Sequence, residues 1–126
     1  MKLVRLTDNK LQELLTRLAS EPLPLKTAFK LKGIIKVATE EFNKYEDVRK
    51  DALQRHGLKN EDGSMQIDER NNVQFDQDGL RAFAGELNEL GQLDVELPTV
   101  TLDQLGDKIA ISAEDLELLE GIVTES

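Results

Sequence analysis

Leucines recur at helical spacing near the start of the chain and predict a first helix from Asp8 to about Ala19. Proline residues 22 and 24 end this helix and open a second one, because proline in the first turn of a helix costs no hydrogen bond. The connection is too short for the two helices to separate, so they should pack as a hairpin. The apolar stripe of the first helix consists of Leu11, Leu14, Leu15 and Leu18.

The second predicted helix is the main feature of the sequence and runs from Leu25 to Arg55, with Gly57 placed to end it. At about 1.5 Å per residue, it would be roughly 45 Å long. The first helix is too short to cover such a helix, so the far half needs a later segment of the chain or another subunit. Alternating spacings of three and four, typical of a heptad seam, connect Ala28, Leu31, Ile35, Ala38, Phe42, Tyr45, Arg49, Ala52 and His56.

After Gly57 the pattern changes from helical spacing to alternation. A β-hairpin with Arg70-Asn71-Asn72 at its tip is predicted by the alternating apolar residues Met65, Ile67, Val73 and Phe75. A third helix follows, with Asp76 or Asp78 as its cap and Gly91 at its end. Its apolar face would comprise Leu80, Phe83, Ala84, Leu87 and Leu90.

Two strand segments and a last helix complete the predicted order of elements. The strand segments are 95–102, which Pro98 interrupts, and 108–111. Ser112 and Asp115 form a capping box for a helix from Ala113 to about Ile122. We therefore expect one α+β, mainly helical domain. Residues 1–57 would be a helical hairpin with one long helix, and residues 58–126 an acidic tail packed on it, with a small β-hairpin or sheet and two short C-terminal helices.

Charge divides the chain into two unlike halves. Of its 126 residues, 1–60 carry a net charge of +5 and 61–126 a net charge of −14, for a total of −9. Either the two halves attract one another within the fold, or opposite ends of different molecules associate head to tail or in a ring. The acidic total argues against nucleic-acid binding. With no long apolar run and no secretory signal, we expect no membrane association and synthesis in the cytoplasm.

Catalytic and metal-binding patterns are weak in this sequence. The chain has no cysteine, and its one histidine, His56, is expected to have a structural role at a helix end. The segment from Leu58 to Glu69 has the glycine of a calcium loop but no ligand at its first position, so we expect no metal or cofactor. We expect no enzyme. A weak anion site, or simply a solvated helix face, is indicated by Lys26, Lys30, Lys32 and Lys36.

Several short motifs together resemble a known family. They are L-P-L-K-x-A-F-K from Leu23, E-E-F-x-x-Y-E-x-x-R from Glu40, R-H-G with N-E-D-G from Arg55, E-L-N-E-L from Glu86, V-x-L from Val95, and I-S-A-E-D-L-x-x-L from Ile111. The chain resembles small uncharacterised proteins of tailed bacteriophages and prophages. The resemblance implies a phage origin and carries no activity. Asn71 and its neighbours stand where the family more often has an Asn-Gly type of turn.

These observations favour a non-enzymatic phage protein that acts by protein–protein interaction, as a virion structural or assembly component. Its partners would be other phage proteins or copies of itself, in the host cytoplasm and, for a structural component, in the virion. The alternative is an accessory protein that binds a host factor or sequesters a small phosphate-containing defence signal. The candidate interface on the far seam comprises Ile35, Phe42, Tyr45, Arg49, Ala52 and Leu53.

Overall fold

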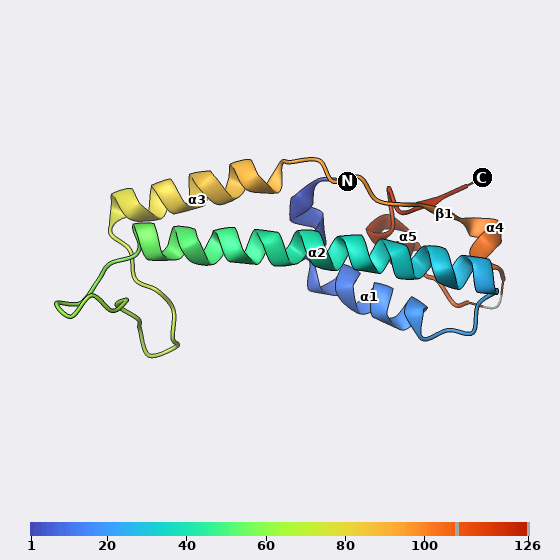
Figure 1. Ribbon diagram of the computed structural model, residues 1–126, viewed down its shortest axis with the longest axis horizontal. Coiled ribbons are helices and arrows are strands. Elements are labelled where there is room, and N and C mark those ends of the chain that lie inside the picture. The colour runs from blue at the N-terminus through green and yellow to red at the C-terminus, as the bar shows by residue number, and fades with distance from the viewer. Residues whose placement is uncertain (108, 126) are drawn as a thin grey trace.

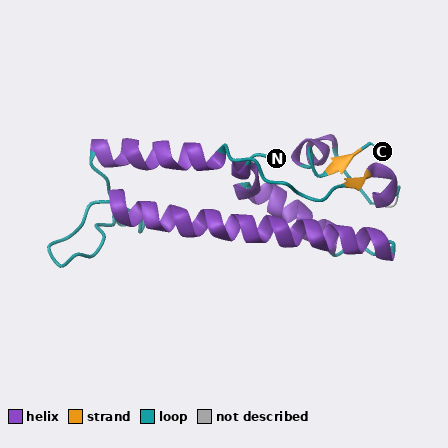
Figure 2. Ribbon diagram, turned by 45° about the horizontal axis from the view of Figure 1, so that its top comes forward, coloured by secondary structure: helices purple, strands orange, loops and turns teal. Residues whose placement is uncertain are grey.

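The computed structural model describes residues 1–107 and 109–125 and shows a mainly helical, elongated molecule (Figure 1). Its length is set by one long helix, against which the other segments pack (Figure 2). In chain order the elements are the 3-10 helix η1 (Leu3–Thr7), α1 (Asn9–Ala19), α2 (Leu25–His56), α3 (Gln77–Gly91), β1 (Val100–Thr101), α4 (Leu102–Leu105), α5 (Ala113–Leu118) and β2 (Val123–Thr124).

Helices α1 and α2 form where their apolar periodicity predicts them. The Asp8 side chain caps α1 by accepting a hydrogen bond of 2.9 Å from the Lys10 backbone N–H. Its four predicted stripe leucines are all buried. Helix α2 is unbroken over 32 residues and is capped by Gly57, whose N–H donates to the Leu53 carbonyl. The long helix packed on a second helix is thus confirmed.

Helix α3 runs back along the far half of α2 (Figures 1 and 2). The Asp76 carboxylate caps it by accepting a hydrogen bond of 2.6 Å from the Gly79 N–H. A later segment of the same chain therefore lies on the far half of α2. Coverage is incomplete, since Gly91 is the one fully buried residue of α3 and its Leu80 remains 54% exposed.

Two successive hairpins, rather than the single one predicted, connect α2 to α3; we call residues 58–75 the double hairpin. Antiparallel bridges join Lys59 to Met65 and Ile67 to Val73, without a regular ladder. Three backbone hydrogen bonds of 2.8–2.9 Å also form a closed cycle. The N–H of Leu58 donates to the carbonyl of Gln74, that of Gln74 to the carbonyl of Gln66, and that of Gln66 to the carbonyl of Leu58. The second hairpin agrees with the alternation in the sequence, and the first was missed.

The loops at 60–64 and 68–72 have the same backbone structure. In each, the first N–H donates to the fifth carbonyl (2.8 and 2.9 Å) and the fourth N–H to the first carbonyl (3.0 Å in both). The fourth residue has a positive φ, 88° at Gly63 and 65° at Asn71. This is the three-residue hairpin loop in which glycine or asparagine takes the left-handed position. Asn71 therefore replaces glycine without changing the tip, and the segment is an eight-residue repeat.

The small sheet is parallel, and only one of its two strands was predicted: β1 lies within the predicted segment 95–102, whereas β2 was not expected. β1 pairs with β2 in the register Val100 to Val123. The predicted strand at 108–111 is wrong for residues 109–111, and Lys108 lies outside the described residues. The last helix ends at Leu118 rather than near Ile122, because the chain turns through Gly121 (φ 90°) and enters the sheet. Ile122 is fully buried there, and its carbonyl accepts from the Val100 N–H.

The core lies between α1, the first half of α2 and the C-terminal segment. Its fully buried side chains are Leu11, Leu18, Ile34, Val100, Leu119 and Ile122. Ion pairs from the basic half to the acidic half surround it: Lys2–Asp94 (3.3 Å), Lys10–Glu114 (3.4 Å) and Arg17–Asp115 (2.8 Å). At Lys2, Lys10 and Arg17, the basic half of the chain therefore attracts the acidic half within one molecule. Over the described residues, no helix combines the length and apolarity needed to cross a membrane.

Candidate interaction surface

A groove runs between α1 and α2 along the predicted seam. It consists of two adjoining hollows of about 360 and 420 Å³ that share Ile35 in their walls. Phe42 lies in the wall of the first hollow and Leu23 in that of the second. Both hollows are lined mainly by apolar carbon, and the polar residues of the first are Gln12, Thr16, Thr39 and Asn43. The groove therefore offers an elongated apolar surface, with neutral polar residues in the first hollow and the charged residues Glu21 and Lys32 at the second.

The six predicted interface residues lie on the same helix but in three different settings. Ile35 and Phe42 line the groove and are half-buried. Tyr45, Arg49 and Leu53 are half-buried on α2 farther along the seam. Ala52 is fully buried, in the half of α2 that α3 covers. The structure thus places Ile35 and Phe42 in one groove and leaves Ala52 inaccessible.

Arg49, the unusual charged residue of the seam, is paired with Glu46 on its own helix. Its Nε and Nη2 atoms donate to the Glu46 carboxylate at 3.1 and 2.9 Å. These hydrogen bonds lower the pKa of Glu46 and raise that of Arg49. The carboxylate partner of Arg49 therefore lies one turn away on α2, and not in the acidic second half of the chain. The pair places a charged, fixed group beyond the end of the apolar groove.

The four lysines of the candidate anion site do not converge. At about 100° per residue, Lys26 and Lys30 lie one turn apart on one face of α2, and Lys32 and Lys36 lie one turn apart about 120° around the helix. All four are exposed. Of them, Lys32 also lies at the rim of the second hollow, near Glu21. The arrangement suits a broad contact better than a small enclosed anion.

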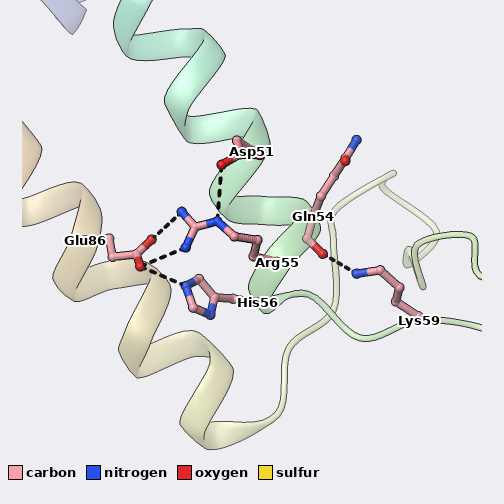
Figure 3. Close-up of polar contacts among 6 residues, drawn as sticks. All are labelled: Asp51, Gln54, Arg55, His56, Lys59 and Glu86. Atoms are coloured by element: carbon pink, nitrogen blue, oxygen red, sulfur yellow. Dashed lines mark hydrogen bonds and ion pairs between the residues drawn. The ribbon is translucent and has the colours of Figure 1, made fainter.

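A polar cluster fastens α3 to the end of α2, as Figure 3 shows. Arg55 donates to both Glu86 carboxylate oxygens (3.1 and 3.0 Å) and to Asp51 (3.2 Å). The pKa of Glu86 is lowered, first by its hydrogen bonds with Arg55 and then by His56. His56 Nε2 is buried 3.2 Å from Glu86 Oε1, at ion-pair distance but without hydrogen-bond alignment. The cluster places His56 in the contact between α2 and α3.

The Lys59 ammonium also donates to the Gln54 carbonyl in the last turn of α2, which ties the start of the double hairpin to the helix (Figure 3). Across the part of the chain that the structure describes, no three His, Asp or Glu side chains are grouped to hold a metal ion.

Two features of the surface were missed from the sequence. One wall of the groove comes from η1, whose Leu6 lines it, and five residues in a 3-10 helix give too short a pattern to detect. The other is the pair Leu25 and Phe29, which are 86% and 79% exposed on α2. The spacing of four between these two residues is visible in the sequence, but neither residue belongs to the predicted seam.

Comparisons with protein families, with curated proteins and with solved structures gave no match. The relation to phage proteins therefore stays a prediction from the sequence motifs. A function can therefore be argued only from the geometry of the groove and from the exposed side chains.

Proposed function

We propose that the protein acts by binding another protein in the groove between α1 and α2, as a structural or assembly component of a phage particle. The observation that carries this proposal is the groove itself, which continues for two adjoining hollows along one side of α2. The phage assignment rests on the motif resemblance alone. No catalytic role is proposed.

The chemistry of the groove favours an amphipathic helix as the bound segment. Such a helix inserts apolar side chains at spacings of three and four into a groove between helices. Ile35 and Phe42 would lose their remaining exposure on binding, and full burial of such side chains contributes roughly 1.5–3 kcal/mol each. Gln12 and Asn43 would satisfy polar groups of the bound helix at one end. Other phage proteins and a second copy of the chain are both suitable sources of the helix.

The alternative function, capture of a phosphate-containing signal or a host factor, has one supporting observation. Lys26, Lys30, Lys32 and Lys36 are exposed cations near the start of α2. Their division between two helix faces gives a small phosphate compound no common point of contact. We therefore place this function second.

The test is to substitute one apolar groove residue and one matched residue outside the groove. Phe42→Lys would place a charge in the groove, while Val48→Lys changes an apolar residue of the same helix that is 45% exposed and does not line it. We expect the first variant to be depleted at least tenfold from purified virions in quantitative mass spectrometry, with helical circular dichroism retained. Val48→Lys should be incorporated as wild type is. Equal incorporation of both, or absence of the wild-type protein from virions and from complexes with phage proteins, would contradict the proposal.

A further inference from the structure

The first half of α2 presents two large apolar side chains to solvent, away from the core. Leu25 is 86% and Phe29 79% exposed, the highest values among the large hydrophobic residues of the described chain. Residues 25, 29, 32 and 36 follow spacings of four, three and four, so they share one helix face within about 60°. Two lysines therefore continue the face that Leu25 and Phe29 begin. We call these four residues the basic face.

The lysines of this region differ from four other cations of the basic half. Lys2, Lys10, Arg17 and Arg55 each pair with a carboxylate of the acidic half. By contrast, the described residues provide no ion pair to any of the four lysines between positions 26 and 36. The fold thus neutralises cations around its core and leaves a positive surface around the two most exposed apolar side chains.

The opposite end of the molecule has the complementary character. Residues 58–78 carry six acidic and two basic residues, and Ile67 in the double hairpin is 54% exposed. Glu61 and Glu69, in the two loops, are exposed and make no ion pair with other described residues. This end therefore offers negative charge beside an exposed aliphatic side chain.

The two ends cannot neutralise one another within a single molecule. α2 separates them along its length (Figure 1), and the 20 residues from Lys36 to His56 span roughly 30 Å of helix. Charges are screened over about 8 Å at physiological ionic strength. Attraction between the two ends can therefore act only between molecules.

We propose that the basic face of one molecule binds the double hairpin of a second copy, with Ile67 against Phe29 and with Glu61 and Glu69 near Lys32 and Lys36. The contact joins two different surfaces, so a bound pair leaves one basic face and one double hairpin free. Such a head-to-tail contact closes into a ring or extends as a filament. Of its residues, only Lys32 also lies at the rim of the second hollow; Leu25, Phe29 and Lys36 line neither hollow.

The experiment measures molar mass by light scattering and sedimentation over a range of protein and salt concentrations. Wild type should grow beyond a dimer as concentration rises at low salt and shift toward monomer at high salt. The double variants K32E/K36E and E61K/E69K should each stay monomeric, because each has lost the charge of one end. An equimolar mixture should regain association, since each variant keeps the end that the other lacks.

Matched single variants separate this contact from a general effect of charge. Lys50 is exposed on the same helix without an ion pair among the described residues, so Lys50→Glu should leave association unchanged where Lys36→Glu weakens it at least fivefold. Phe29→Ala should weaken it similarly, and Val48→Ala should not. A strictly monomeric wild type, or a mixture that fails to associate, would overturn the proposal. The proposal would also be overturned if the lysines bound anionic vesicles or an acidic protein while the E61K/E69K variant self-associated as wild type does.

Discussion

At the scale of single residues, the junction of α2 and α3 is fixed by a close backbone approach. A Cβ atom at Gly79 would lie 2.5 Å from the carbonyl oxygen of His56 and 3.0 Å from Oδ1 of Asp76. The first of these is a backbone atom in the last turn of α2, which cannot move without shifting the helix. Glycine at 79 therefore allows the start of α3 to meet the end of α2. Gly85, two turns later, has open space where its Cβ would be.

This contrast predicts opposite effects for the same substitution in one helix. Gly79→Ala should lower the free energy of unfolding by about 1–3 kcal/mol, as overpacking typically does. Gly85→Ala should raise it by about 0.5–1 kcal/mol, because alanine favours the helix where nothing obstructs it. Urea denaturation of the two variants and wild type would measure both. A gain in stability from Gly79→Ala would show that α3 begins farther from α2. In the sequence the two glycines are indistinguishable, since the difference arises from a neighbouring helix.

At the scale of elements, Glu86 connects α3 to α2 through two cations of the α2 C-terminus. Its carboxylate accepts from Arg55 and lies beside His56, and both interactions favour the charged form. Glu89 is on the same helix, exposed, and makes no ion pair with other described residues. The two glutamates therefore separate the effect of the connection from that of helix charge.

The lowered pKa of Glu86 predicts acid sensitivity of this connection. A carboxyl group whose pKa is lower in the folded state contributes stability that is complete above its unfolded pKa, about 4.3, and is lost as pH falls through the folded value. Glu86→Gln should therefore lower the melting temperature at pH 7, and the difference from wild type should narrow toward pH 3. Glu89→Gln should differ little from wild type at either pH. A Glu86→Gln deficit that is the same at pH 7 and pH 3 would contradict the ionic account.

The elements predictable from sequence are those whose pattern is long enough to repeat. Helices α1, α2 and α3 have several turns of apolar spacing and capping residues, and their bounds agree with the prediction to within a residue or two. β1 lies within the predicted strand segment 95–102, but β2 was not predicted, because the two strands have two residues each and pair across more than twenty intervening residues, which no local pattern records. The same holds for the candidate surface. Ile35 and Phe42 were recognised from the seam, but the opposite wall comes from other segments.

At the scale of the whole molecule, the two ends of α2 have unequal support. The first half is packed in a core that includes Ile34, Leu119 and Ile122 at 0% exposure. The far half, with α3, buries Ala52 fully but leaves Phe83 and Leu87 half-buried. Antiparallel packing of two helices without a third layer cannot enclose the side chains between them. The far end is thus an arm with a small core, attached to a better packed body.

Unequal support predicts that the arm opens before the body unfolds. Amide protection follows the local free energy of opening, which is lower where few apolar contacts are buried. Amides of α3 and of 46–56 should exchange with smaller protection factors than those of α1 and 27–38, in hydrogen exchange resolved by residue. Leu87→Ala should reduce protection mainly in the arm. Ile34→Ala should cost about 2–5 kcal/mol of global stability and lower protection throughout. Uniform protection, with Leu87→Ala lowering it equally in α1 and α3, would mean instead that the molecule unfolds as one cooperative unit.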